Sequence, residues 1–248
     1  LTCSEVTRLK GEPGDFEASV TRWARSVDEE KCTGCGECWM KCPVKVPSEY
    51  EVGLGDRKAI WVPFPQSVPN VPAIDRENCV YFLKQKCRLC EKVCKAQAID
   101  FEQEDERLSL RVGGVIIAPG FSGFDAQLWS EYGYGRFLNV VTSLGFERIL
   151  NASGPYQGEL KRPSDGNPPR RIAFIQCVGS RYSRSHGKNR GNGYCSSVCC
   201  TYAIKEAMIA KEHSPTPLEV TIFFMDLRTY GKDFDKYYDR AKEESGIK

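Results

Sequence analysis

The first 23 residues alternate between apolar and polar positions with a period of about two, which is typical of β-strands. One alternating run covers residues 1–9 and a second covers residues 16–23, with Gly11, Pro13 and Gly14 between them. Glycine and proline at such positions favour a tight turn. The pattern therefore predicts a β-hairpin at the start of the chain.

Two short apolar runs further along predict buried strands. Residues 115–118 form the first, which stops at Pro119 and Gly120, and residues 171–176 form the second, which ends at Cys177. Ligands of α/β folds bind at the carboxyl edge of such strands. The ends of both runs are therefore candidate binding positions.

Helical patterns lie between and after these runs. Residues 140–150 predict a helix capped by Thr142 or Ser143, and a second helix opens near Cys195 and continues to residue 212. Another strand at 218–226 and a charged helix ending near residue 245 close the chain. The order of elements predicts an α/β fold in this half.

Composition narrows the function classes. The 248 residues suffice for one or two domains, and a net charge of +2 gives no bulk electrostatic reason to bind nucleic acid. No apolar run approaches the ~18 residues of a membrane helix, and no signal peptide is visible. Because the chain starts without Met, we expect a fragment or a processed chain. Thirteen cysteines without a secretory signal indicate a reducing compartment, the cytoplasm, and metal ligation.

The first cysteine run has the spacing C-x2-C-x2-C-x3-C-P, which is the bacterial iron–sulfur pattern. Its members are Cys32, Cys35, Cys38 and Cys42, followed by Pro43. Three thiolates at three-residue steps can surround one face of a 4Fe–4S cubane. Gly34 and Gly36 permit the backbone conformations that such a tight loop requires.

A second run follows with the stretched spacing C-x7-C-x2-C-x3-C and with lysine where proline would be expected. Its members are Cys79, Cys87, Cys90 and Cys94. In two-cluster ferredoxins the fourth cysteine of each run ligates the other cluster. This rule predicts one cluster on Cys32, Cys35, Cys38 and Cys94, and another on Cys79, Cys87, Cys90 and Cys42.

Two alternatives compete with iron–sulfur ligation. Paired C-x2-C motifs also make zinc sites, but eight cysteines would need two zinc ions, and the C-x3-C-P ending is unusual for zinc. A disulfide framework is disfavoured because thiols so close in sequence are poorly placed to bridge one another.

A third group of cysteines lies in the α/β half. Cys177 ends a predicted strand, and Cys195, Cys199 and Cys200 lie near the start of the next helix, where the helix dipole favours thiolates. Spacing alone leaves two readings open, a third cluster or core thiols. The G-x-G-x-x-G loop of a dinucleotide-binding unit is missing here, which disfavours a nicotinamide cofactor. The basic loop from Arg181 to Arg190 is interpreted as a solvated loop.

Several blocks together resemble the A subunit of heterodisulfide reductase, which is a flavin-containing iron–sulfur protein of methanogens and related anaerobes. The resemblance is carried by residues 28–38, 57–66, 114–120, 146–150, 172–181, 194–200 and 226–232. It implies a partial thioredoxin-reductase-like FAD domain of α/β class, with an inserted α+β ferredoxin-like domain that holds two 4Fe–4S clusters. Residues 1–27 and 107–248 would belong to the FAD domain, and residues 28–106 would be the insert.

The resemblance also implies roles for particular residues. The third cysteine group would hold a cluster close to the flavin, making three 4Fe–4S clusters in all. Glu147 and Lys205 match positions near the reactive flavin nitrogen and would be catalytic. Further FAD contacts would come from Glu5, Val6, Ala118, Pro119 and Gly120. The family's amino-terminal G-x-G-x-x-G half is absent, so we expect a missing segment to complete the FAD site.

The function implied by the resemblance is flavin-based electron bifurcation between ferredoxin and a disulfide, which in methanogens joins coenzymes M and B. The implied partners are the B and C subunits, a hydrogenase or formate dehydrogenase module, ferredoxin, and a second copy of this chain's own kind. One alternative is a relay component of a quinone-interacting or aromatic-acyl-CoA-reducing complex. Another is a non-catalytic 4Fe–4S wire, and a third is a zinc-stabilised interaction module.

Overall fold

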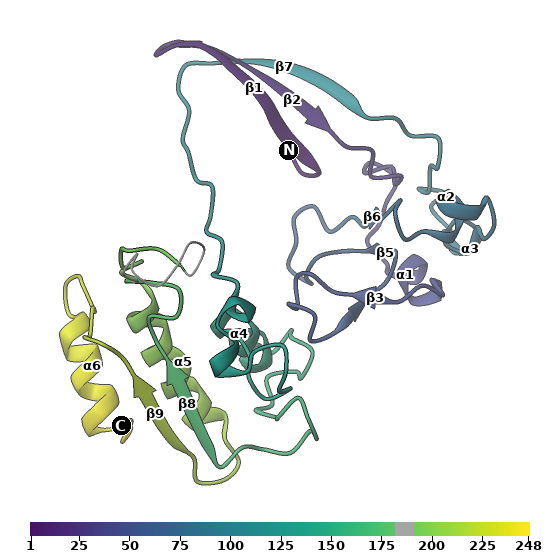
Figure 1. The fold of residues 1–248 in the computed structure, drawn as a ribbon. Coiled ribbons are helices and arrows are strands. Elements are labelled where there is room, and N and C mark those ends of the chain that lie inside the picture. Colours follow the sequence, from purple (N-terminus) through teal and green to yellow (C-terminus); the bar gives the residue numbers. More distant parts are fainter. Residues whose placement is uncertain (182–190) are drawn as a thin grey trace. The chain divides into compact units, whose positions relative to one another are not determined.

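The computed structural model describes residues 1–181 and 191–248, and it divides into two compact units (Figure 1). The first unit spans Leu1–Gly120 and the second spans Phe121–Lys248.

A three-stranded antiparallel sheet joins segments from near the start and near the end of the first unit. Its strands are β1 (Ser4–Glu12), β2 (Asp15–Arg22) and β7 (Glu106–Val112), in the order β1-β2-β7. Glu12 pairs with Asp15 across the turn, where Gly14 has a φ of 99° that favours glycine. The predicted hairpin is confirmed.

The cysteine-rich segment runs between β2 and β7 and contains only short elements. They are α1 (Glu37–Lys41), β3 (Val46–Pro47), β4 (Asp56–Arg57), β5 (Ile60–Trp61), β6 (Ala73–Ile74), α2 (Val80–Lys84) and α3 (Leu89–Val93). Its core consists of a few apolar residues against which the cysteines pack, namely Val27, Cys38, Ile60, Val71, Ile74, Ala98 and Phe101. So small a core leaves much of the stability to whatever the cysteines bind.

The two ends of this segment meet in neighbouring strands. Arg22 at the end of β2 pairs with Glu106 at the start of β7. A domain inserted into another fold needs its entry and exit to lie close together. The pairing therefore suits an insert at residues 28–106, and the assignment of the flanking segments to a FAD domain stays a prediction.

The prediction of a buried strand at residues 115–118 is wrong. Strand β7 ends at Val112, and the apolar side chains that follow are exposed, Ile116 by 95% and Ile117 by 83%. A strand needs a neighbour for its backbone groups, and no described strand pairs with this run. An apolar run alone does not specify such a neighbour.

The second unit is built around two parallel strands. Its elements are η1 (Ala126–Leu128), η2 (Ser130–Tyr132), α4 (Ser143–Leu150), β8 (Arg171–Ile175), α5 (Cys199–His213), β9 (Glu219–Phe223) and α6 (Phe234–Glu243). Helix α5 packs against β9, α4 and α6. The buried core contains Ala203, Ile204 and Ala207 of α5 together with Ile149 and Val220. The segment that follows the carboxyl end of β8 leads into α5, and the segment that follows the carboxyl end of β9 leads into α6.

Most predicted elements of this unit are present. Thr142 caps α4 by accepting a hydrogen bond from the backbone N–H of Gly145 at 3.2 Å. The strand predicted at 171–176 is present as β8, but the expectation that it is buried is wrong except at Phe174, because β8 pairs with one described strand only. Helix α5 begins at Cys199, so Cys195 precedes it.

Among the described residues, none of the helices has the length and apolar character needed to cross a membrane.

Candidate metal centres and cofactor pocket

The four cysteines predicted to share the first cluster line one small pocket. Cys32, Cys35 and Cys38 come from the loop before α1 and from α1 itself, and Cys94 follows α3. Gly34 and Gly36 line the same pocket with φ of 68° and 86°. A Cβ on Gly34 would lie 2.9 Å from the backbone oxygen of Asn70, so the loop requires glycine there.

Backbone amides also point at these sulfurs. The N–H of Ala98 donates to the Sγ of Cys94 at 3.3 Å. A hydrogen bond of this kind stabilises negative charge on the sulfur, and it therefore favours the thiolate that a metal requires.

The second group is brought together around Cys90. Its pKa is raised to about 12, mainly by burial and then by the nearby thiols of Cys79, Cys38 and Cys42. Cys79 and Cys42 belong to the predicted second set, and Cys38 belongs to the first, so the two groups are neighbours. Cys87, the remaining member, is exposed and has a φ of 72° in the turn before α3.

Burial makes these thiols unfavourable as free anions. The pKa of Cys38 is raised to about 11, first by burial and further by Cys32 and Cys35. Several thiolates in one pocket would repel one another unless a cation lay between them. The donor set therefore fits a positively charged iron core, which binds thiolates and releases their protons.

Within the part of the chain that the structure describes, no three cysteine, histidine or acidic side chains converge closely enough to hold a single metal ion. The four cysteines of the first set line the walls of one small pocket.

In the second unit, three of the four predicted cysteines gather at the start of α5. Burial raises the pKa of Cys200, and the neighbouring Cys199 and Cys177 raise it further. Cys177 follows β8 and has a φ of 63°, which turns the chain sharply after the strand. The first turn of α5 has no side-chain cap, so its backbone N–H groups are free to face anionic sulfur.

Cys195 is related to this group through Arg228. Cys195 lies close enough to Arg228 to contribute to the raised pKa of its guanidinium. A backbone hydrogen bond from Arg228 in turn lowers the pKa of Cys200. The N–H of Ser197 donates to the Cys195 Sγ at 3.3 Å. Residues 182–190, which include most of the basic loop, lie outside the described residues.

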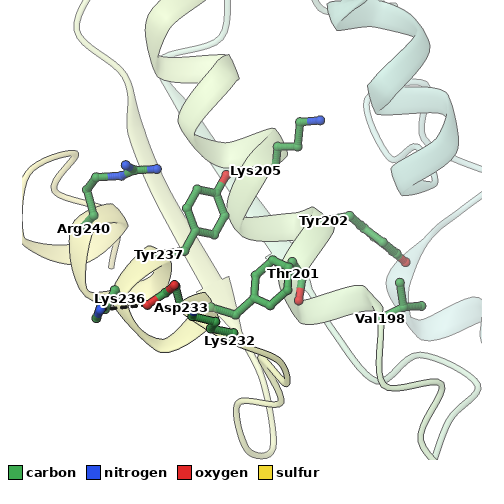
Figure 2. A pocket seen from close by; sticks show the side chains of 10 residues that line it. Val198, Thr201, Tyr202, Lys205, Lys232, Asp233, Lys236, Tyr237 and Arg240 are labelled. Atoms are coloured by element: carbon green, nitrogen blue, oxygen red, sulfur yellow. Dashed lines mark hydrogen bonds and ion pairs between the residues drawn. The ribbon is translucent and has the colours of Figure 1, made fainter.

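Lys205 lines a pocket of about 740 Å³ between α5 and α6 (Figure 2). Val198, Thr201 and Tyr202 line it from the α5 side, and Lys232, Asp233, Phe234, Lys236, Tyr237 and Arg240 line it from α6 and the residues before it. The pocket thus combines four cations and three aromatic rings with one carboxylate. Lys236 donates to that carboxylate, on Asp233, at 2.7 Å.

The remaining cations give the pocket its charge. Among the described residues, no carboxylate lies within ion-pair distance of Lys205, Lys232 or Arg240. A pocket of this size suits a drug-sized or cofactor-sized ligand.

Glu147 and Lys205 form no ion pair. Glu147 lies on α4 with its Oε1 at 4.0 Å from Nη1 of Arg148. The carboxylate of Glu147 instead raises the pKa of Glu206, a residue that the sequence analysis does not identify as functional. Glu206 is 7% exposed, and its Oε2 has no hydrogen-bond partner in the described part of the chain.

Burial, with a smaller contribution from Glu147, raises the pKa of Glu206 to about 8. The carboxyl of Glu206, which is buried between α5 and α4, therefore holds its proton at neutral pH. In the sequence, the one signal of this buried carboxyl is that Glu206 lies six residues after Cys200 on a helix face that is otherwise apolar.

The other predicted FAD contacts belong to the first unit. Glu5 and Val6 lie on β1, where the side chain of Val6 is 62% exposed, and Ala118, Pro119 and Gly120 lie in the exposed run after β7. Their role stays a prediction.

The chain is similar to known proteins at two levels, that of a domain family and that of whole-chain relatives. The 4Fe–4S binding domain family matches residues 25–48, which hold the whole first cysteine run. Over all 248 residues the chain is 47% identical to the iron–sulfur A subunit of the CoB–CoM heterodisulfide reductase of Methanocaldococcus jannaschii. It belongs to the family of heterodisulfide reductase A subunits.

Two further relatives give the same result. The chain is 43% identical over 248 residues to the A subunit of the H2:CoB-CoM heterodisulfide, ferredoxin reductase of Methanothermobacter marburgensis. It is 42% identical over 243 residues to the A subunit of the ferredoxin/F420H2-dependent CoB-CoM heterodisulfide reductase of Methanosarcina acetivorans. All of this chain matches the first two relatives and 98% of it matches the third, while it spans 36%, 36% and 29% of their lengths.

The pocket geometry predicts crossed ligation. Replacing Cys94 with serine should damage the cluster held mainly by the first run, and replacing Cys42 should damage the one held mainly by the second run, because serine is a poor substitute for thiolate. Electron paramagnetic resonance of the reduced variants, with iron analysis, distinguishes the two signals. Damage confined to the cluster of each residue's own run would contradict the crossed assignment.

The buried carboxyl predicts a pH-dependent stability. The folded-state pKa of Glu206, about 8, lies above its unfolded value near 4.5, so the folded state keeps a proton that the unfolded state has lost. This contribution to stability is present below pH 4.5 and is lost as the pH rises through 8. Glu206→Gln should flatten the dependence and stabilise the protein at pH 9 by on the order of a few kcal/mol.

Thermal unfolding between pH 5 and 9 measures this effect. Glu212→Gln removes an exposed carboxylate from the same helix and is the matched control. If the Glu206 and Glu212 variants change the pH profile equally, Glu206 does not hold the proton.

Proposed function

We propose that this chain is an electron-transfer part of a heterodisulfide reductase-type complex, carrying three 4Fe–4S clusters and contributing to an FAD site. The observation that carries the proposal is the pocket shared by Cys32, Cys35, Cys38 and Cys94. Residues more than 50 positions apart meet there in the combination expected of a two-cluster ferredoxin.

The three cysteine groups would hold the clusters by complementary means. Tight glycine-containing loops order the first group, and the second group is gathered around the buried Cys90. The third lies at the open end of α5, where the unpaired backbone N–H groups favour negative charge. Burial raises the pKa of Cys38, Cys90 and Cys200, so the positively charged iron would have to offset it before the thiolates form. The clusters would then exchange single electrons.

The pocket between α5 and α6 is proposed to take part of the FAD. Glu5, Val6 and residues 118–120 are proposed as further FAD contacts on the strength of the family resemblance alone. A bound flavin would supply two-electron chemistry and exchange electrons singly with the clusters. The aromatic side chains of the pocket suit its ring. The ammonium of Lys205 would donate a hydrogen bond to the ring and stabilise negative charge that develops on it.

Proton transfer is assigned to the carboxyl groups at the α4–α5 contact. Glu147 is half exposed and can exchange a proton with solvent, as a general acid–base residue must. Glu206 keeps a proton at neutral pH and faces Glu147, so it would serve as a reserve for that exchange. Reduction by two electrons commonly needs such a proton.

The activity and partners of the whole protein are inferred from the relatives. All three names include the CoB-CoM heterodisulfide, those from Methanothermobacter marburgensis and Methanosarcina acetivorans include ferredoxin, and the former includes H2. A further relative, from Methanococcus maripaludis, is named for H2 or formate. We infer that the complete protein divides electron pairs between ferredoxin and a disulfide. It would do so with B and C subunits, a hydrogenase or formate dehydrogenase module, and a second copy of itself.

The third cluster is tested by iron and sulfide analysis of the anaerobically purified complex. Replacing Cys199 and Cys200 with alanine should remove about one cluster's iron, because the cluster needs their thiolates. The other clusters should keep their spectra. Unchanged iron content would return Cys177, Cys195, Cys199 and Cys200 to a role as core thiols, and zinc in place of iron would refute the proposal as a whole.

The role of Lys205 is tested in the same complex. Lys205→Ala should leave the iron content intact, lower the reduction potential of the flavin and uncouple ferredoxin reduction from disulfide reduction, because a stabilising positive charge is lost. Lys242→Ala, on the exposed face of α6, is the control. Flavin redox titration measures the effect, and an unchanged potential with FAD bound would contradict it. A complex without FAD would favour a simple electron relay.

A further inference from the structure

One part of the first unit carries an excess of positive charge. Residues 84–95 contain four lysines, one arginine and a single acid, Glu91. The five cationic side chains are all exposed, and we call them the basic surface: Lys84, Lys86, Arg88, Lys92 and Lys95. They lie on α2, on α3 and in the segments that follow each helix (Figure 1).

Little of this charge is neutralised. Glu91 accepts from Arg88 at 2.6 Å and is thereby occupied. Among the described residues, the four lysines have no carboxylate within ion-pair distance. The guanidinium of Arg88 lies 5.4 Å from the ring centroids of both Tyr81 and Phe101, which hold it in place. The basic surface is therefore largely unpaired, with its one arginine fixed against two rings.

Apolar side chains are exposed among these cations. Leu83 is 60% exposed and Leu89 is 41% exposed, although each lies next to a charged residue in the sequence. An apolar centre with a charged rim is the usual anatomy of a protein interface.

The basic surface also adjoins a cluster ligand. Cys87 lies between Lys86 and Arg88 and is exposed, so the second cluster would come close to solvent here. Cys35 of the first run is exposed too, but its surroundings differ in charge. Lys31 is paired with Asp28 at 3.0 Å, and Glu30 and Glu37 add negative charge.

We propose that the basic surface is the docking site for a small electron-carrier protein with an acidic face, which exchanges electrons with the second cluster. The proposal rests on the proposed function, because it requires that cluster. Charge complementarity selects the partner, since unpaired cations attract an acidic protein and orient it before contact. Electron-transfer encounters need only a small interface, below about 1,200 Å².

The redox step is a single transfer without bond making. In the direction measured below, one electron would leave the reduced carrier and enter the oxidised cluster that Cys42, Cys79, Cys87 and Cys90 would hold, so the carrier would be oxidised and that cluster reduced. No proton and no leaving group take part.

The test uses the intact complex, a purified acidic ferredoxin as the probe, and the double variant Lys84→Glu, Lys92→Glu. Neither lysine is adjacent in sequence to a cysteine. Stopped-flow measurement should give a second-order rate constant for reduction by ferredoxin that falls about tenfold or more at low ionic strength. Its dependence on salt should weaken at the same time.

The matched control is Arg8→Glu, Lys10→Glu on β1, which makes the same charge change on exposed residues and should keep the wild-type rate. Reduction of the double variant by an uncharged mediator should also be normal. A wild-type rate and salt dependence in the double variant, with full iron content, would overturn the proposal. Slow reduction of the double variant by the uncharged mediator would overturn the proposal as well. The substitutions would then have changed the reduction of the cluster itself and not the docking of the carrier.

Two further outcomes separate this inference from the proposed function. A wild-type complex without iron on the second cysteine run would refute the proposed function. Dissociation of the complex by the double variant, seen by size-exclusion chromatography, would overturn the docking proposal alone, because another protein of the complex would then cover the basic surface.

Discussion

The first unit depends on one electrostatic constraint, which is that its buried thiols become anions only when a cation lies between them. Burial raises the pKa of Cys38 to about 11 and that of Cys90 to about 12. Iron binding therefore has to displace protons that the fold itself retains. The apolar core around these thiols is small and includes Val27, Ile60 and Phe101. Metal binding and folding of this unit are accordingly coupled, and the crossing of Cys42 and Cys94 would couple the two sites to each other.

The sequence predicted those features that depend on neighbouring residues. The hairpin follows from alternation and from Gly14, and the start of α4 follows from the cap at Thr142. The cysteine spacing likewise gave a ligand set whose members Cys32 and Cys94 line one pocket in the structure. In each case the physical cause is local, or it is a loop geometry that recurs among ferredoxins.

Features that depend on distant partners could not be predicted in this way. The apolar run at 115–118 has the composition of a buried strand, but composition does not specify the neighbouring strand, and Ile116 is exposed. The expected burial of β8 is wrong for the same reason, because β8 pairs with one described strand only. The pocket between α5 and α6 could not be predicted from the sequence. Its cations, which include Lys232 and Arg240, have the sequence pattern of surface residues, and only the packing of the two helices brings them together.

Lys205 and Glu206 show how one helix can separate two kinds of chemistry. Successive residues of an α-helix point about 100° apart, because 3.6 residues complete a turn. Lys205 therefore lines the pocket toward α6, while Glu206 is buried toward Glu147 of α4. A lysine that lines a pocket and a carboxyl that keeps a proton are held one residue apart without forming an ion pair. Had they paired, the attraction would have lowered the pKa of Glu206 and removed the proton at neutral pH. Their separation by the helix is thus what leaves the buried carboxyl of Glu206 protonated at neutral pH.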